Sequence, residues 1–192
     1  MAKIRKIIGR EAEDDLKLKL KLGRVSFSLV TSLDAEFVLR LRLDSGLNRF
    51  LNSTSADLEI QKDWISKYKL REAEGLEYYF VIHKESEKVG LVRMYDFRGL
   101  SFCWGSWVIL RGTEPHVALA SVAIIYDLAF DHIGFKKSHF DVRKDNLSVK
   151  RFHLRMGAVI VESDELNDYY QYHDVCYASY RPKLMQLIDR KN

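Results

Sequence analysis

The stretch that decides the fold is SHFDVRKDNLSVKRFHLRMGA, residues 138–158. It predicts a strand that runs to about Lys144 and a helix that starts at Asn146, because asparagine is a favoured residue at a helix N-terminus. Gly157 is placed to end that helix. His153 lies inside the helix, seven residues after its start, at a position where a core-facing helix would favour an inert side chain. The stretch therefore predicts a strand–helix unit with two polar residues, Asn146 and His153, that call for an explanation.

Length and composition limit the number of domains that the chain can form. The chain has 192 residues, of which 47% are hydrophobic, which is enough for one well-packed domain. Residues 1–15 are charged and lack a clear period, so we expect an N-terminal extension of uncertain order followed by a single domain over residues 16–192.

Charge and cysteine content narrow the class of protein. The net charge of +4 is spread through the sequence, which does not favour a nucleic-acid partner. Cys103 and Cys176 lie in apolar or aromatic runs, and nothing resembles a secretion signal, so we expect reduced thiols and a cytoplasmic location. No apolar run approaches the roughly 18 residues that a membrane span needs, so no membrane association is expected.

The order of predicted elements indicates an α+β fold. Leucines alternate with lysines over residues 16–22, which predicts an edge strand with a solvated lysine face, and Gly23 turns the chain into a second strand. Two helices follow, the second capped by Ser55 or Asp57. The remaining expected elements are three antiparallel strands over 76–84, 87–97 and 100–110, a long apolar helix over 115–134, the strand–helix unit, a strand over 157–163 and an aromatic strand over 168–180.

The chain passes from a strand into the long helix near residues 110–117. Backbone N–H groups in the first turn of a helix have no partner within the helix, and the positive end of the helix dipole lies behind them. Such a helix start favours phosphate binding.

Element order and motif spacing together resemble the Gcn5-related N-acetyltransferase (GNAT) superfamily. In many members the helix after the second-half strand reads Asn, a small residue three positions on, an apolar residue, then Tyr, with Gly four residues beyond. The offsets here fall on Asn146, Val149, Phe152, His153 and Gly157. The resemblance covers roughly residues 16–180 and is greatest to the branch that includes ribosomal-protein N-terminal acetyltransferases and acetyltransferases of bacterial surface-sugar pathways. It implies a mixed, mostly antiparallel central sheet flanked by helices and splayed at the cofactor site.

The resemblance also implies acetyl-CoA as co-substrate. The family's glycine-containing pyrophosphate loop falls on Thr113, His116 and Ala118, of which only the last keeps the small residue of the pattern. Phosphate binding would then rest on backbone amides around His116 to Ala118, helped by Arg111 or Thr113, and Asn146 would contact the pantetheine arm. The residues expected to contact acetyl-CoA are Val108, Ile109, Arg111, Thr113, His116, Val117, Ala118 and Asn146.

The implied chemistry is direct attack of a neutral amine on the thioester. An amide near Val108 or Ile109 would stabilise the oxyanion. His153 stands at the position of the family's tyrosine and would protonate the departing thiolate, and Glu114 would deprotonate the amine, although a first-turn acid also suits the helix dipole alone. Direct transfer requires no Cys/His or Ser/His/Asp triad.

The acceptor wall in this family comes from the segment between the two N-terminal helices. That link contributes Asn48 and Arg49, and Arg93 and Trp107 are the other candidate substrate residues. Neutral hydrogen-bonding groups with a single cation suit hydroxyls and a phosphate, which favours a nucleotide-linked amino sugar. The alternatives are the N-terminus of a protein or peptide, and a non-catalytic domain of the same fold that binds CoA or a partner. No histidine pair has metal-ligand spacing, so no metal site is expected, and the aromatic last strand could pair across a homodimer.

Overall fold

The structure is a computed structural model that describes residues 20–47 and 54–189. Its strands are hydrogen-bonded in the order β1-β2-β3-β4-β5-β6-β8-β7, and of the strand pairs with a defined register only β5 and β6 run parallel. This is the α+β, mostly antiparallel sheet with flanking helices that the sequence predicts. The chain folds into two compact units, residues 1–95 with 105–113 and residues 96–104 with 114–192. The expectation of a single domain over 16–192, preceded by an extension over 1–15, stays a prediction.

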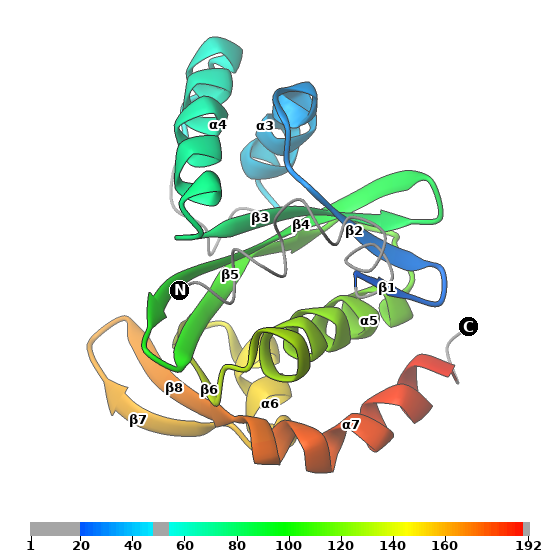
Figure 1. The fold of residues 1–192 in the computed structure, drawn as a ribbon, viewed down its shortest axis with the longest axis vertical. Helices are drawn as coiled ribbons and strands as arrows, with labels where there is room; N and C mark the ends of the chain where they lie inside the picture. Colours follow the sequence, from blue (N-terminus) through cyan, green and yellow to red (C-terminus); the bar gives the residue numbers. More distant parts are fainter. Residues whose placement is uncertain (1–19, 48–53, 190–192) are drawn as a thin grey trace. The chain divides into compact units, whose positions relative to one another are not determined.

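The first unit places two helices beside a meander of strands. Its elements are β1 (Lys21–Leu22), β2 (Val25–Leu29), a 3₁₀ turn (Ser32–Asp34), α3 (Ala35–Leu43), α4 (Leu58–Ala73), β3 (Tyr78–Lys84), β4 (Glu87–Arg98, to residue 95) and β5 (Ser101–Ile109, from residue 105). Figure 1 shows α3 and α4 side by side on one face of β2, β3 and β4. The predicted strand over 16–22 lies partly outside the described residues; Leu20 is buried and β1 covers Lys21–Leu22.

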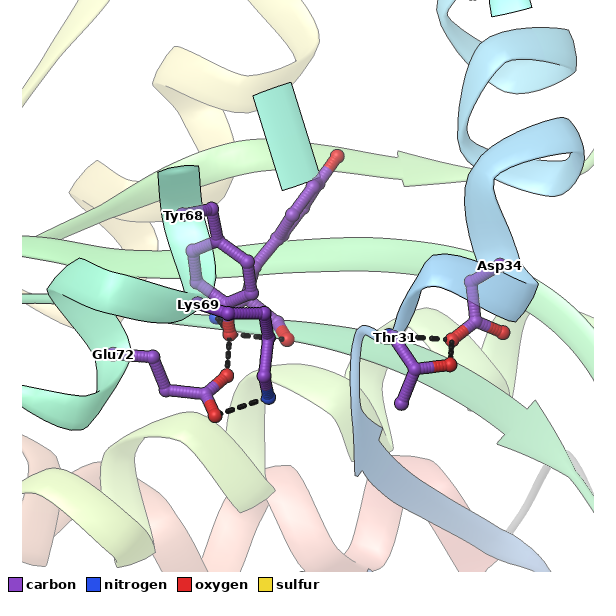
Figure 2. A network of polar contacts seen from close by, with 6 residues as sticks. Thr31, Asp34, Tyr68, Lys69 and Glu72 are labelled. Atoms are coloured by element: carbon purple, nitrogen blue, oxygen red, sulfur yellow. Dashed lines mark hydrogen bonds and ion pairs between the residues drawn. The ribbon is translucent and has the colours of Figure 1, made fainter. Parts of the chain in front are cut away.

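Side-chain caps define where these helices begin. The Asp34 carboxylate accepts hydrogen bonds from the backbone N–H of Thr31 (2.7 Å) and from its hydroxyl (2.9 Å), and it pairs with Lys88 at 2.7 Å. Figure 2 shows the Thr31–Asp34 cap at the start of the turn that leads into α3. Asp57 accepts from the N–H groups of Glu59 and Ile60 and caps α4, which confirms one of the two predicted caps.

The core of the first unit lies between its helices and strands. Tyr68 on α4 is fully buried and donates its hydroxyl hydrogen to Glu72 (Figure 2). The same hydroxyl accepts from the backbone N–H of Tyr79 at 2.8 Å. Burial of this phenol and its bond to Glu72 raise its pKa far above the ordinary value. A neutral tyrosine therefore joins α4 to β3 within the core.

The second unit combines three α-helices and a π-helical turn with a second set of strands. Its elements are the parts of β4 and β5 over residues 96–104, α5 (Pro115–Tyr126), a π-helical turn (Asp127–Ile133), β6 (Lys137–Arg143), α6 (Leu147–Met156), β7 (Val159–Ser163), β8 (Asn167–His173) and α7 (Asp174–Asp189). The long predicted helix thus changes to π-helical hydrogen bonding after Tyr126 and ends at Gly134, whose φ of 90° only glycine adopts readily.

The predicted aromatic strand over 168–180 is wrong in its second half. β8 ends at His173 and α7 begins at Asp174. Tyr177, Leu184 and Ile188 are the buried side chains of α7, and their spacing of seven and four residues follows one face of a helix. Tyr177 and Arg181, four residues apart, both donate to Asp127 of the π turn, at 2.6 and 2.7 Å. Contacts with α5 and the π turn therefore hold this segment in a helix.

Candidate active site

The first turn of α5 contains a buried histidine, His116. Glu114 is the N-cap and Pro115 the first helical residue, and the N–H of Val117 donates to the Glu114 carbonyl at 3.0 Å. His116 is 6% exposed, and among the described residues neither of its ring nitrogens has a hydrogen-bond partner. An unpaired buried polar group costs about 1–3 kcal/mol. His116 thus places unmet hydrogen-bonding capacity beside a helix N-terminus.

Helix α6 has the ends that its sequence predicts. The Asn146 side chain accepts from the backbone N–H of Val149 at 3.4 Å, and Gly157 adopts a φ of 99° at the C-terminal end. The helix-capping interpretation of Asn146 is confirmed, and its contact with pantetheine stays a prediction.

His153 on α6 lies in an aromatic cluster. It is 4% exposed, with ring centroids 4.3 Å from Phe140, 5.7 Å from Trp104 and 6.3 Å from Tyr170. Desolvation lowers its pKa to about 3, so the imidazole is neutral near pH 7. If His153 protonates the departing thiolate, the proton must come from the N–H of the neutral ring and not from an imidazolium. The proton-donor role stays a prediction.

Arg111 lies against the link that follows α3. Its Nη2 is 3.4 Å from an Asp44 carboxylate oxygen, and the same oxygen accepts from the N–H of Gly46 at 2.8 Å. A Cβ added at Gly46 would lie 1.0 Å from Arg111 Nη2. Arg111, expected to contact a phosphate, is therefore packed over a glycine and paired with a carboxylate in the first unit.

The end of β5 carries the predicted oxyanion donors. Val108 is buried, and a Cβ at Gly90 on β4 would lie 2.5 Å from the Val108 carbonyl oxygen, so the two backbones approach closely. Ser106, two residues earlier, has a φ of 47°, which is uncommon for a residue other than glycine inside a strand. Strand irregularities of this kind are frequent next to active sites. Ile109 ends β5, and Thr113 follows in the turn, where its N–H donates to Leu110 at 3.2 Å.

Arg93, a candidate substrate residue on β4, is part of a partly buried ion cluster. Its guanidinium pairs with Glu77, which also accepts from Arg71 at 2.6 Å and is itself 3% exposed. The Arg93 guanidinium also lies 5.7 Å from the Trp64 ring and 4.8 Å from the Tyr95 ring. Desolvation, with Arg71 adding a like charge, lowers the pKa of Arg93 from its ordinary value.

Of the other candidate substrate residues, the structure describes only Trp107. Trp107 lies half-buried on β5. Asn48 and Arg49 lie outside the described residues, so their predicted roles stay as predictions. Within residues 20–47 and 54–189, no group of histidine, cysteine or acidic residues is arranged to hold a metal ion.

Comparison with known proteins decides the family. Residues 24–159 match the family described as acetyltransferase (GNAT) domain. The chain belongs to the GNAT acetyltransferase family. It is thus an acyltransferase, and the members of this family use acetyl-CoA. No match was found among curated proteins.

Solved structures agree with this assignment. The acetyltransferase is 36% identical to apo FdhC, described as a nucleotide-linked sugar GNAT, over 88% of its own length and 97% of FdhC, with a TM-score of 0.79. SpeG of Vibrio cholerae, a spermidine/spermine N-acetyltransferase, shares 13% identity over 82% and 98% of the two chains, with a TM-score of 0.68. RimL, a ribosomal L7/L12 α-N-protein acetyltransferase, shares 11% over 80% and 93%, with a TM-score of 0.69. The last two show the common fold alone.

One helical segment of the acetyltransferase meets the length and composition of a membrane span. It covers Pro115–Ile133, and most of it is buried inside the protein, as in a core helix. No such segment was expected from the sequence, because charged and polar residues interrupt its longest apolar run.

Sequence reasoning missed a hydrogen-bonded group in the second unit. Ser101, His139 and Asp96 form a continuous chain across β5, β6 and β4, with Ser101 Oγ 2.7 Å from His139 Nδ1 and His139 Nε2 3.2 Å from Asp96 Oδ2. The residues are 38 and 43 positions apart in sequence, so no local spacing could reveal them. The one local signal is a charged residue, Asp96, inside the strand expected over 87–97.

Proposed function

We propose that this acetyltransferase transfers the acetyl group of acetyl-CoA to the amine of a nucleotide-linked amino sugar. The observation that carries the acceptor class is the 36% identity to FdhC, a nucleotide-linked sugar GNAT, over nearly the full length of both chains. SpeG, a spermidine/spermine N-acetyltransferase, and RimL, a ribosomal L7/L12 α-N-protein acetyltransferase, are only 13% and 11% identical to the chain.

The start of α5 supports acetyl-CoA binding. A helix N-terminus favours a pyrophosphate, and beside it His116 adds a buried imidazole whose two nitrogens have no hydrogen-bond partner within residues 20–47 and 54–189. His116, Val117 and Ala118 would hold the pyrophosphate. The glycines of the family's pyrophosphate loop are absent from this chain. The imidazole of His116 would therefore supply the phosphate contact that the backbone makes where glycines let it approach closely.

Strand pairing in the second unit supports a place for the pantetheine arm. The register between β5 and β6 consists of two pairs, Ser101 with Lys137 and Phe102 with Ser138, whereas β6 pairs with β8 along all of its length. One edge of β6 after Ser138 thus lacks a ladder to β5, and an extended chain such as pantetheine can pair with such an edge. Asn146 would contact the arm, and Val108, Ile109, Arg111 and Thr113 stay predicted contacts.

The proposed chemistry is direct transfer. The amine attacks the thioester carbonyl, backbone N–H groups stabilise the oxyanion, and the CoA thiolate leaves with the electron pair of the C–S bond. Glu114 and His153 stay the predicted base and acid. Glu114 is exposed at the N-cap, and burial lowers the pKa of His153 to about 3, well below the value near the working pH that general acid–base catalysis favours.

The acceptor site is proposed to include Arg93 and Trp107 together with Asn48 and Arg49. A guanidinium suits the diphosphate of a nucleotide sugar, because it donates two parallel hydrogen bonds to a phosphate. Arg93 already pairs with Glu77, so phosphate binding there would require Arg93 to share its donors. A cytoplasmic location and the absence of nucleic-acid and membrane partners complete the proposal. A homodimer is also proposed, though not through the last strand of the sequence, because β8 lies between β6 and β7.

Two measurements, made one after the other, test the proposal. Isothermal calorimetry should show saturable binding of acetyl-CoA, and thiol release should then be measured with UDP- and dTDP-linked amino sugars, spermidine, and peptides with a free N-terminus. The highest kcat/KM is expected for a nucleotide-linked amino sugar. Highest activity on peptides would favour the protein N-terminal alternative, and absence of acetyl-CoA binding by folded protein would refute the proposal.

A further inference from the structure

Two arginines of the first unit share one buried carboxylate. Glu77, which directly precedes β3 and is 3% exposed, accepts from Arg71 Nε at its Oε1 (2.6 Å) and from Arg93 Nη2 at its Oε2. Arg71 lies in the last turn of α4 and Arg93 lies on β4, so the carboxylate joins a helix to a strand. Because the two guanidiniums bind the two oxygens of a single carboxylate, they lie side by side.

The arginine pair, Arg71 and Arg93, keeps donors that the protein does not use. A guanidinium carries five N–H donors. Within residues 20–47 and 54–189, Arg71 donates to Glu77 through Nε and Arg93 through Nη2, and the buried Nε of Arg93 has no hydrogen-bond partner there. The two side chains are 37% and 25% exposed, so each remains partly accessible from solvent. The pair therefore retains donors for a ligand of opposite charge.

The arginine pair also carries more positive charge than its carboxylate neutralises. Two guanidiniums face the single negative charge of Glu77. Desolvation lowers the pKa of Arg93 most, and the like charge of Arg71 lowers it further. Glu72, the carboxylate next to Arg71 on α4, pairs with Lys69 (Figure 2). An anion bound between the two guanidiniums would relieve their mutual repulsion.

Aromatic rings hold the two guanidiniums in place. That of Arg93 lies 4.8 Å from the ring centroid of Tyr95 and 5.7 Å from that of Trp64. The guanidinium of Arg71 is also 5.7 Å from the Trp64 ring. A Cβ added at Gly105 on β5 would lie 3.1 Å from the Tyr95 hydroxyl oxygen, so this glycine leaves room for the ring. Arginines that are already ordered lose less conformational freedom when they bind a ligand, which favours affinity.

We propose that Arg71 and Arg93 together bind the diphosphate of the nucleotide-linked acceptor. This inference rests on the proposed function. Each guanidinium donates parallel hydrogen bonds to the oxygens of one phosphate, and the excess positive charge of the pair complements the diphosphate. A polyamine or the ammonium of a peptide N-terminus carries positive charge and would be repelled. The arginine pair thus selects a nucleotide-linked sugar over the other acceptor classes.

The arginine pair lies in the same unit as the predicted thioester site. Arg93 is three residues along β4 from Gly90, where the backbone of β4 approaches the Val108 carbonyl. Three residues of a strand span about 10 Å. In a nucleotide-linked amino sugar, the sugar ring separates the amine from the diphosphate. One such molecule can therefore extend from Arg93 toward Val108.

Calorimetric titration with UDP and dTDP tests the site without any acetyl transfer. The protein is first saturated with CoA, so that the nucleotides cannot bind in place of the cofactor. The wild type should bind UDP and dTDP, and UMP at least about tenfold more weakly, because it lacks the second phosphate. No binding of UDP or dTDP, or UMP binding as tight as UDP, would overturn the inference.

Variants of the two arginines assign the binding to them. Arg71→Gln and Arg93→Gln should each weaken UDP binding by about 10–100-fold, the loss expected when hydrogen bonds to a charged group are removed. The matched control is Arg24→Gln, at a 72% exposed arginine that pairs with Glu85, which should keep the wild-type affinity. Where a glutamine variant does not fold, the lysine variant replaces it and should still weaken UDP binding, because lysine lacks the planar fork. Wild-type UDP affinity in folded variants of both arginines would overturn the inference.

Kinetics separate this inference from the proposed function. With a nucleotide-linked amino sugar, Arg71→Gln should raise the acceptor KM by about 10–100-fold and leave kcat and the KM for acetyl-CoA unchanged, as for loss of uniform binding. An unchanged acceptor KM in both folded glutamine variants would overturn the diphosphate site and leave transfer to nucleotide-linked amino sugars standing. Highest wild-type activity on a peptide or on spermidine would instead refute the proposed function, and this inference with it.

Discussion

Replacing His153 with phenylalanine should make the acetyltransferase markedly more resistant to acid. The folded protein holds this imidazole neutral with a pKa of about 3, whereas in the unfolded chain the ordinary value is about 6.5. Between these values the unfolded state binds one more proton than the native state, so stability falls as the pH falls. The effect is absent above the unfolded pKa and grows below it.

The magnitude follows from the two pKa values. Each pH unit inside the window is worth about 1.4 kcal/mol, so lowering the pH from 7.5 to 5.0 should remove about 2 kcal/mol of stability through His153 alone. Phenylalanine suits the cluster of Phe140, Trp104 and Tyr170 chemically, and any overpacking adds a cost of about 1–3 kcal/mol that does not depend on pH. The difference between the two pH values is therefore independent of packing.

Urea unfolding at pH 7.5 and 5.0 measures this difference. The wild type should lose about 2 kcal/mol more than His153→Phe between the two pH values, and His153→Leu should behave like His153→Phe. His173→Gln, at an exposed histidine, should lose as much as the wild type. Equal losses in wild type and His153→Phe would show that His153 is not held neutral by burial.

The same variant decides the proposed proton-donor role. A general acid contributes about 10²–10⁴-fold to turnover, so loss of that magnitude in folded His153→Phe would assign His153 to the mechanism. An unchanged kcat would leave His153 as a packing residue of the aromatic cluster.

Three further changes test separate parts of the structure. Gly46→Ala should change the free energy of unfolding in urea by no more than about 0.5 kcal/mol, because the Arg111 guanidinium that its Cβ would meet is the far end of a flexible, 67% exposed side chain that can move aside. His116→Leu should raise the stability of the ligand-free protein by about 1–3 kcal/mol, since it removes unpaired buried nitrogens, yet weaken acetyl-CoA binding in calorimetry. The pKa of Asp34 is lowered, since Lys88 and Thr31 outweigh the desolvation that opposes ionisation; Asp34→Asn should therefore cost about 1–3 kcal/mol at pH 7 and progressively less below the ordinary aspartate pKa, as followed by urea unfolding against pH.

Local signals predicted most of the helices and strands. Asn146 and Gly157 bracket α6 because a side-chain cap and a left-handed glycine act within one turn of the chain. The motif offsets through His153 were enough to identify the family. The segment after His173 failed because its aromatic residues suit a strand, and only contact with Asp127 and α5 makes the helix the better choice.

By itself the sequence determined the element order as far as His173, the start of α4, both ends of α6 and, through the motif spacing, the family, since each of these signals depends on residues close together in the chain. The tertiary structure alone decided the state of the polar groups. Burial among aromatic rings makes His153 neutral, and enclosure leaves the nitrogens of His116 without a hydrogen-bond partner in the part of the chain that the structure describes. Strand order brings Ser101, His139 and Asp96 within hydrogen-bonding distance. Solvation and proton sharing depend on neighbours in space, and those neighbours come from distant parts of the chain.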